Sequence, residues 1–80
     1  MNEKIYKRLL ELIEESMPEV DVSGAGMDTR FIEDLRYDSL GLMTLVMNVE
    51  KEFSVAFNTF YQINTIKDIY DFIVNKMGIK

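Results

Sequence analysis

The sequence predicts a small all-α fold, a bundle of three long helices and one short helix. Three stretches, residues 2–17, 39–53 and 65–77, carry apolar side chains every three or four positions, which is the spacing of one helical face. No stretch shows the strict alternation of apolar and polar residues that predicts a reliable strand. A chain of 80 residues is sufficient for one small core, so we expect residues 1–80 to form a single domain.

The first helix is predicted over residues 2–17. Asn2 is a suitable N-cap, because its side-chain oxygen can accept a hydrogen bond from a free amide of the first turn. Pro18 ends the helix, because its ring disfavours helical backbone angles in the residue before it. The apolar face consists of Ile5, Leu9, Leu12 and Ile13, widened by Leu10 and Met17.

Residues 18–37 show no sustained periodicity and are rich in glycine, serine and aspartate, so we expect a long loop between the first two long helices. A loop of about twenty residues is unusual in a compact domain and indicates a functional role. Short helical turns near residues 27–30 or 31–35 would shorten it. We expect Phe31, Ile32 and Leu35 to anchor its second half in the core.

The second long helix is predicted over residues 39–53, with Asp38 or Ser39 as its N-cap. Met43 lies beside its apolar face, where we expect it to pack, whereas Met47 lies on the outward side. The apolar face consists of Leu42, Leu45, Val46, Val49 and Phe53.

A short helix or a single turn is expected over residues 59–63. The last long helix begins at a Thr-x-x-Asp capping box formed by Thr65 and Asp68, and Gly78 is a suitable residue for its end. Its apolar face consists of Ile66, Ile69, Ile73 and Met77, flanked by Tyr70 and Phe72.

The composition excludes several classes of function. The chain has no cysteine and no histidine, so it has no disulfide, no thiolate metal site and no Ser-His-Asp triad. A net charge of −5 disfavours binding to nucleic acid or to anionic membranes and favours basic partner surfaces. No apolar run has the length of a transmembrane helix and no signal peptide is evident, so we expect a cytoplasmic protein without membrane insertion.

We expect no metal site. The segment that begins at Asp21 resembles the start of a calcium-binding loop, with Gly26 in the sixth place. Ala25, however, cannot supply a side-chain oxygen, and Ile32 occupies the twelfth place, where such loops need a glutamate. A loop made flexible by glycine is therefore the better interpretation.

The tripeptide Asp38-Ser39-Leu40 lies where the long loop meets the second long helix. A serine hydroxyl at such a junction is exposed at its tip while its backbone is held by the helix. It can serve either as a helix cap or as the attachment point of a bulky group. The tripeptide alone leaves both roles open, and the surrounding chain adds the deciding context.

Essentially the whole chain resembles the acyl carrier proteins, a family of phosphopantetheine-binding carriers. The family pattern is Leu-Gly-x-Asp-Ser-Leu, followed by a helix that ends in Glu-x-x-Phe or a similar sequence. Here residues 35–40 read Leu-Arg-Tyr-Asp-Ser-Leu, and residues 50–53 read Glu-Lys-Glu-Phe. The resemblance implies the family's four-helix fold. It also implies a 4′-phosphopantetheine group attached covalently to Ser39 by a phosphopantetheinyl transferase.

The resemblance further implies a carrier and not an enzyme. Acyl intermediates would be carried as thioesters between acyl-transferring and synthase enzymes, in fatty-acid synthesis or in a dedicated pathway for polyketides or other specialised lipids. An aminoacyl or peptidyl carrier remains an alternative, as does a helical interaction module without a prosthetic group. We expect a monomer, and we expect partners to recognise the second long helix through Leu40, Thr44, Met47, Asn48, Glu50 and Lys51.

Two departures from the family pattern stand out. Arg36 replaces the usual glycine and adds a positive charge beside the attachment site, and the second long helix has few of the acids that typical fatty-acid carriers expose.

The core either is solid or admits an acyl chain. The candidates to line such a pocket are Leu42, Leu45, Val46, Val49, Phe57, Ile63, Ile66 and Ile69.

Overall fold

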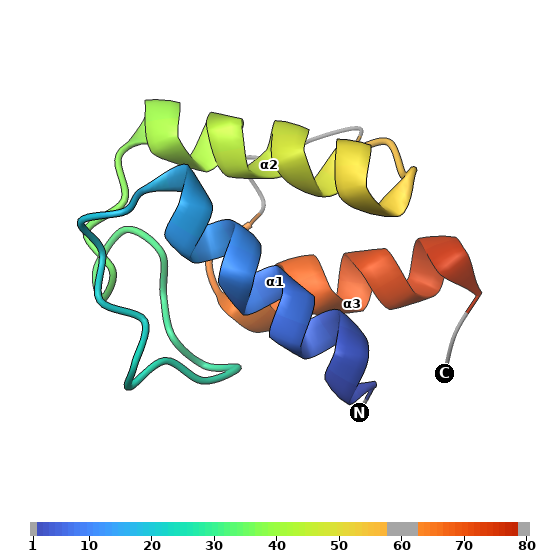
Figure 1. Ribbon diagram of the computed structural model, residues 1–80, viewed down its shortest axis with the longest axis horizontal. Coiled ribbons are helices and arrows are strands. Elements are labelled where there is room, and N and C mark those ends of the chain that lie inside the picture. The colour runs from blue at the N-terminus through green and yellow to red at the C-terminus, as the bar shows by residue number, and fades with distance from the viewer. Residues whose placement is uncertain (1, 58–62, 79–80) are drawn as a thin grey trace.

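The computed structural model describes residues 2–57 and 63–78, and within these it contains three helices (Figure 1). They are α1 (Glu3–Ser16), α2 (Ser39–Phe53) and α3 (Ile66–Met77). α1 packs against both α2 and α3. The prediction of an all-α fold is confirmed for the described residues, whose paired extended backbone is limited to an isolated bridge between Arg30 and Thr65. Of the short helix expected over residues 59–63, residues 59–62 lie outside the described residues.

One hydrophobic core joins the three helices. Their predicted apolar faces are confirmed in the main, because each helix buries four side chains at helical spacing. These are Ile5, Leu9, Leu12 and Ile13 of α1, Leu42, Leu45, Val46 and Val49 of α2, and Ile66, Ile69, Tyr70 and Ile73 of α3. Met43 and Met77 were expected to pack, but they lie at the edges of their faces and are 45% and 43% exposed.

The ends of the helices follow the predicted capping residues. The Asn2 side chain accepts a hydrogen bond from the Ile5 amide at 3.2 Å and so caps α1. The two side chains of the Thr65–Asp68 capping box each accept from the other residue's backbone amide, which fixes the start of α3. α3 ends at Gly78, which has a φ of 72° and a left-handed conformation that glycine adopts without steric cost.

The long loop between α1 and α2 also closes the first turn of α3. The first amides of a helix have no partner within the helix and need acceptors from elsewhere. Here loop carbonyls supply them, and the loop in turn donates one amide to the segment before α3. The three hydrogen bonds are Ile66 N to Thr29 O at 3.0 Å, Lys67 N to Met27 O at 2.9 Å and Phe31 N to Asn64 O at 2.9 Å.

Buried side chains anchor this loop in the core. Phe31 and Leu35 are buried as predicted, whereas the prediction for Ile32 is wrong, because its side chain is 46% exposed. Val20 and Tyr37 are two further anchors. The Tyr37 ring meets Phe31 edge to face at 5.4 Å, and the Tyr37 hydroxyl donates to the Ile13 carbonyl of α1. The loop contains hydrogen-bonded turns at residues 26–29 and 30–35, but neither is a helix.

Candidate functional site

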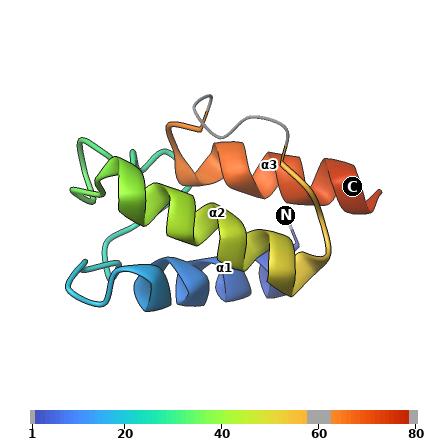
Figure 2. The same ribbon diagram turned by 90° about the horizontal axis from the view of Figure 1, so that it is seen from above.

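The Asp-Ser-Leu motif lies at the first turn of α2, beside the end of α1 (Figure 1). The start of α1 and the end of α3 lie at the opposite end of the molecule (Figure 2). Asp38 is the N-cap of α2, and its Oδ1 accepts a hydrogen bond from the Gly41 amide at 2.6 Å. Ser39 is therefore the first helical residue and is not needed as a cap. Its side chain is exposed, and it makes no hydrogen bond within the described part of the chain.

Contacts from α1 hold the first turns of α2 in place. Gly41 lies against the Met17 side chain so closely that a Cβ at position 41 would overlap the Met17 sulfur. About two turns further along α2 than Gly41, the Asn48 side-chain amide donates to the Ser16 hydroxyl of α1 at 2.9 Å. The backbone that carries Ser39 is therefore packed on one side, while the hydroxyl faces solvent.

The segment before the motif is held by Tyr37 and turned by Arg36. Burial raises the pKa of the Tyr37 hydroxyl well above its ordinary value, with a smaller contribution from the negative charge of Glu19. This hydroxyl therefore stays protonated and remains a donor to α1. Arg36 has a φ of 63°, in the left-handed region that favours glycine. Arg36 lies between the buried residues Leu35 and Tyr37 and occupies the position where the Leu-Gly-x-Asp-Ser-Leu pattern has glycine. Its left-handed conformation is one that glycine adopts readily.

The first turn of α2 suits a phosphodiester on Ser39. It contains no acidic residue, and Asp38 just before it already uses a carboxylate oxygen as the cap. Helix N-termini present free amides and the positive end of the helix dipole, which favour an anion. The exposed hydroxyl, the absence of an acid in the turn and the helix N-terminus together fit a 4′-phosphopantetheine group at this position.

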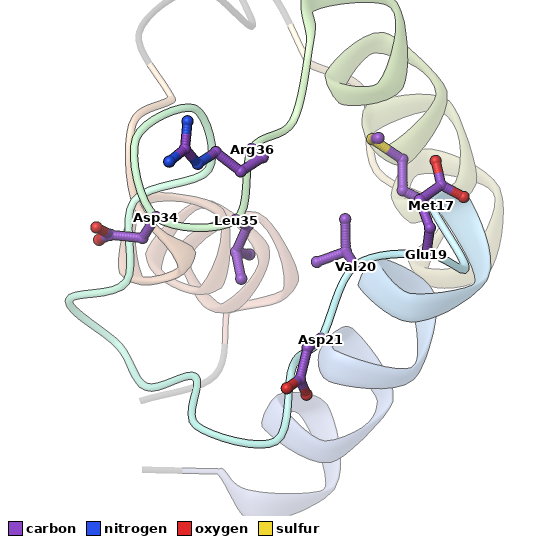
Figure 3. A pocket seen from close by; sticks show the side chains of 7 residues that line it. All are labelled: Met17, Glu19, Val20, Asp21, Asp34, Leu35 and Arg36. Atoms are coloured by element: carbon purple, nitrogen blue, oxygen red, sulfur yellow. The ribbon is translucent and has the colours of Figure 1, made fainter.

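A groove of about 300 Å³ lies beside this segment, between the end of α1 and residues 34–36 (Figure 3). Met17, Val20 and Leu35 supply its apolar lining, and the Arg36 side chain, which also lines it, points away from Met17. The remaining lining residues are the acids Glu19, Asp21 and Asp34.

The carboxylates of this groove are not arranged for catalysis. The guanidinium of Arg30 lowers the pKa of Asp34, mainly through their side-chain hydrogen bond, and the Ser23 amide lowers the pKa of Asp21. A carboxylate with a lowered pKa is a poor general base at neutral pH. Within residues 2–57 and 63–78, no three Asp or Glu side chains gather in a way that could hold a metal ion.

Comparisons with known proteins identify the family. The model of the phosphopantetheine attachment site matches residues 7–73. An acyl carrier protein of Thermotoga maritima is 36% identical over 78 residues, which are 95% of either chain. An acyl carrier protein of Coprothermobacter proteolyticus is 31% identical over 80 residues, 98% of this chain and 96% of its own. The acyl carrier protein of Aster yellows witches'-broom phytoplasma is 37% identical over 71 residues, 86% and 92% of the two chains.

The chain belongs to the acyl carrier protein family.

Membership of the acyl carrier protein family implies a covalently attached 4′-phosphopantetheine group and interactions with transferase and synthase enzymes. Acyl carrier proteins are carriers rather than enzymes. None of the helices that the structure describes combines the length and the apolar composition needed to span a membrane.

The residues that we expect partners of the acyl carrier to recognise occupy two kinds of position on α2. Leu40, Thr44, Met47 and Lys51 are exposed. Asn48 and Glu50 are half-buried and make internal hydrogen bonds, Asn48 to Ser16 and Glu50 to the Phe57 amide at 2.8 Å. The internal bond of Glu50 was not predicted, because residues 54–57 carry no periodic pattern that places them beside α2.

The side chains predicted to line an acyl pocket in this carrier lie together in the core. All of them are buried except Phe57, which is half-buried and stacks on Phe72 with ring centroids 3.9 Å apart. Entry of an acyl chain between them stays a prediction.

Proposed function

We propose that Ser39 carries the 4′-phosphopantetheine arm and that residues 1–80 act as one acyl carrier domain. The observation that supports this most directly is the division of roles in the motif. Asp38 caps α2, so the exposed Ser39 hydroxyl is available for modification. Tyr37 and Gly41, on either side, hold the backbone of the motif against α1.

Attachment needs chemistry that the transferase must supply. The Ser39 oxygen forms a bond to the phosphorus that carries pantetheine in coenzyme A, and the bond from that phosphorus to the nucleotide part breaks. We assign the base that takes the hydroxyl proton to the transferase, because this chain has no histidine and Asp38, the carboxylate adjacent to Ser39 in the sequence, serves as the cap of α2. When bound, the group supplies a thiol that forms thioesters, and without cysteine the carrier has no competing thiol.

The proposed cargo is an acyl intermediate of fatty-acid synthesis or of a dedicated polyketide or specialised-lipid pathway. The relatives are named as acyl carrier proteins, which supports acyl over aminoacyl or peptidyl cargo. The scarcity of free acids on α2 favours a dedicated set of partners over the basic enzymes of general fatty-acid synthesis. Loading of the arm-bearing protein from malonyl-coenzyme A by a malonyl transferase would support this, and loading only by an amino-acid-adenylating enzyme would contradict it.

Intact-mass measurement tests the attachment. We expect the protein, incubated with coenzyme A and a broad-specificity phosphopantetheinyl transferase, to gain the mass of one phosphopantetheine. Ser39→Ala should gain none, whereas the matched control Ser23→Ala, which changes another exposed serine in the loop, should gain the full mass. A full gain in Ser39→Ala would contradict Ser39 as the attachment site. No gain in the native chain would contradict the carrier role and would favour the helical interaction module. The cytoplasmic location expected from the sequence is part of this proposal.

A further inference from the structure

Arg36, three residues before Ser39, holds a strained backbone conformation that no internal contact of its side chain explains. Its φ of 63° lies in the left-handed region, which is unfavourable for a residue with a Cβ. The side chain is exposed, and within the described residues it forms no ion pair and no hydrogen bond. Strained residues gather at functional sites, where the strain persists because the position is needed. Arg36 therefore offers a positive charge that the described part of the chain does not neutralise.

The carboxylates around Arg36 are engaged elsewhere. Asp34 accepts two hydrogen bonds from the Arg30 guanidinium, at 3.1 and 3.2 Å. Asp38 is the cap of α2. The two other acids that line the same groove follow the end of α1, on the side from which the Arg36 side chain points away (Figure 3). An anion that binds Arg36 therefore need not displace an existing ion pair.

The side chains of Arg36 and Ser39 both point away from the end of α1. In the first turn of α2, Gly41 faces α1 and lies against Met17. At about 100° per residue, Ser39 lies about 200° round the helix from Gly41, which directs it to nearly the opposite side. Arg36 likewise points away from Met17 (Figure 3). Three residues of chain span at most about 11 Å, which a long arginine side chain and a phosphodiester on the serine can bridge together.

We propose that the Arg36 guanidinium binds the phosphodiester that attaches the arm to Ser39, and so fixes the base of the arm. The proposal rests on the proposed function, because this phosphodiester exists only once Ser39 is modified. A guanidinium presents its N–H groups in a plane that matches two phosphate oxygens, and such charge-assisted hydrogen bonds are stronger than neutral ones. Covalent attachment keeps the phosphodiester at a high effective concentration beside Arg36. Arg36 is thus a positioning residue, which limits the directions in which the arm leaves the carrier.

Thermal unfolding of the protein with and without its arm tests this contact. Each variant is modified with excess transferase, and intact mass confirms one phosphopantetheine per chain. At low salt, the arm should raise the Tm of the native chain by about 2–6 °C more than it raises the Tm of Arg36→Gln. At about 1 M salt, where charges are screened within roughly 3 Å, this excess should disappear. Arg36→Lys should keep part of the excess, because it retains the charge but not the planar donors.

Phosphorus NMR observes the contact directly, because the phosphodiester contains the single phosphorus atom of the modified protein. At low salt, the chemical shift of this phosphorus should differ between the native chain and Arg36→Gln. Lys51→Gln is the matched control for both measurements. It removes another exposed cation that forms no ion pair within the described residues, and it gives the same net charge. Lys51 lies about 18 Å along α2 from Ser39, so this variant should behave as the native chain does.

The proposal would be overturned if the arm raised the Tm of the native chain and of Arg36→Gln equally, or if their phosphorus shifts were the same. An equal loss in Lys51→Gln would attribute the effect to net charge and would also overturn it. A higher transferase KM for Arg36→Gln, with both measurements unchanged, would instead assign Arg36 to a contact with the enzyme. Failure of the proposed function is distinct, because the native chain would then gain no phosphopantetheine, or Ser39→Ala would gain it as well.

Discussion

Replacing Arg36 with glycine should stabilise the fold, because Arg36 holds a backbone angle that glycine adopts without steric cost. Its φ is 63°, and a left-handed conformation costs a residue with a Cβ roughly 1–2 kcal/mol. Glycine loses roughly 0.5–1 kcal/mol more conformational freedom on folding, so the net gain in the free energy of unfolding is about 0.5–1 kcal/mol. The exposed Arg36 side chain forms no ion pair within the described residues, so little is lost with it.

Urea denaturation followed by circular dichroism at pH 7 measures this gain directly. In thermal unfolding, Tm should rise by roughly 2–8 °C, since 1 kcal/mol corresponds to about 4–8 °C in a domain of this size. Arg36→Ala is the matched control, because it removes the same charge and keeps the Cβ, so it should bring no gain. Ser54→Gly, at a residue with a φ of 55° after α2, should bring a comparable gain far from the attachment site.

The comparison of glycine with alanine decides whether backbone strain is the cause. Equal stabilisation by Arg36→Gly and Arg36→Ala would attribute the effect to the lost charge and refute the reasoning. A glycine variant less stable than the native chain would show that the turn is not strained by the Cβ. Intact mass after the transferase reaction should be the same for both variants, because Ser39 is retained.

Three further predictions concern the contacts around α1 and α2. Tyr37→Phe should lower the free energy of unfolding by about 0.5–1.5 kcal/mol in urea denaturation, because one hydrogen bond to α1 is lost. An unchanged value would show that the hydroxyl adds nothing. Gly41→Ala should stabilise by up to about 1 kcal/mol in a Met17→Ala background, through helix propensity, but by less with Met17 present. An equal change in the free energy of unfolding in the two backgrounds would contradict the close contact between Gly41 and Met17. The hydrogen bond from Arg8 lowers the pKa of Glu52 in the folded protein. The contribution of this pair to the free energy of unfolding should therefore be fully present above the ordinary glutamate pKa of about 4.3. It should be lost as the pH falls through the lower pKa of Glu52 in the folded protein. Between pH 7 and pH 2, Tm should therefore fall less for Glu52→Gln than for the native chain. An equal fall in Tm for the two proteins would refute the assignment.

The sequence predicted the helices well because their signals are local. Asn2 and the Thr65–Asp68 box act on amides within one turn, so the residues that cap a helix can be recognised without the rest of the fold. The same holds for Asp38, although the sequence alone could not decide between Asp38 and Ser39 as the cap. The structure assigns the cap to Asp38 through its bond to the Gly41 amide.

The long loop was predicted less well, because its side chains are sorted by contacts with distant residues. Ile32 was expected inside and is exposed, whereas Val20 and Tyr37 are buried and were not recognised as anchors. In a segment without periodicity, hydrophobicity alone does not reveal which side chains face the core. Tyr37 is buried because α1 offers the Ile13 carbonyl to its hydroxyl and the loop offers the Phe31 ring.

Local patterns in the chain were enough to predict the all-α class, the bounds of the three described helices to within a residue or two and the motif that resembles a phosphopantetheine attachment site. These depend on helical periodicity, capping and a short run of residues around Ser39. The positive φ of Arg36 and the internal contacts of Glu50 and Glu52 could be seen in the folded chain alone. They depend on how segments without a periodic pattern are turned and packed against the helices, which brings the Phe57 amide to Glu50 and Arg8 of α1 to Glu52.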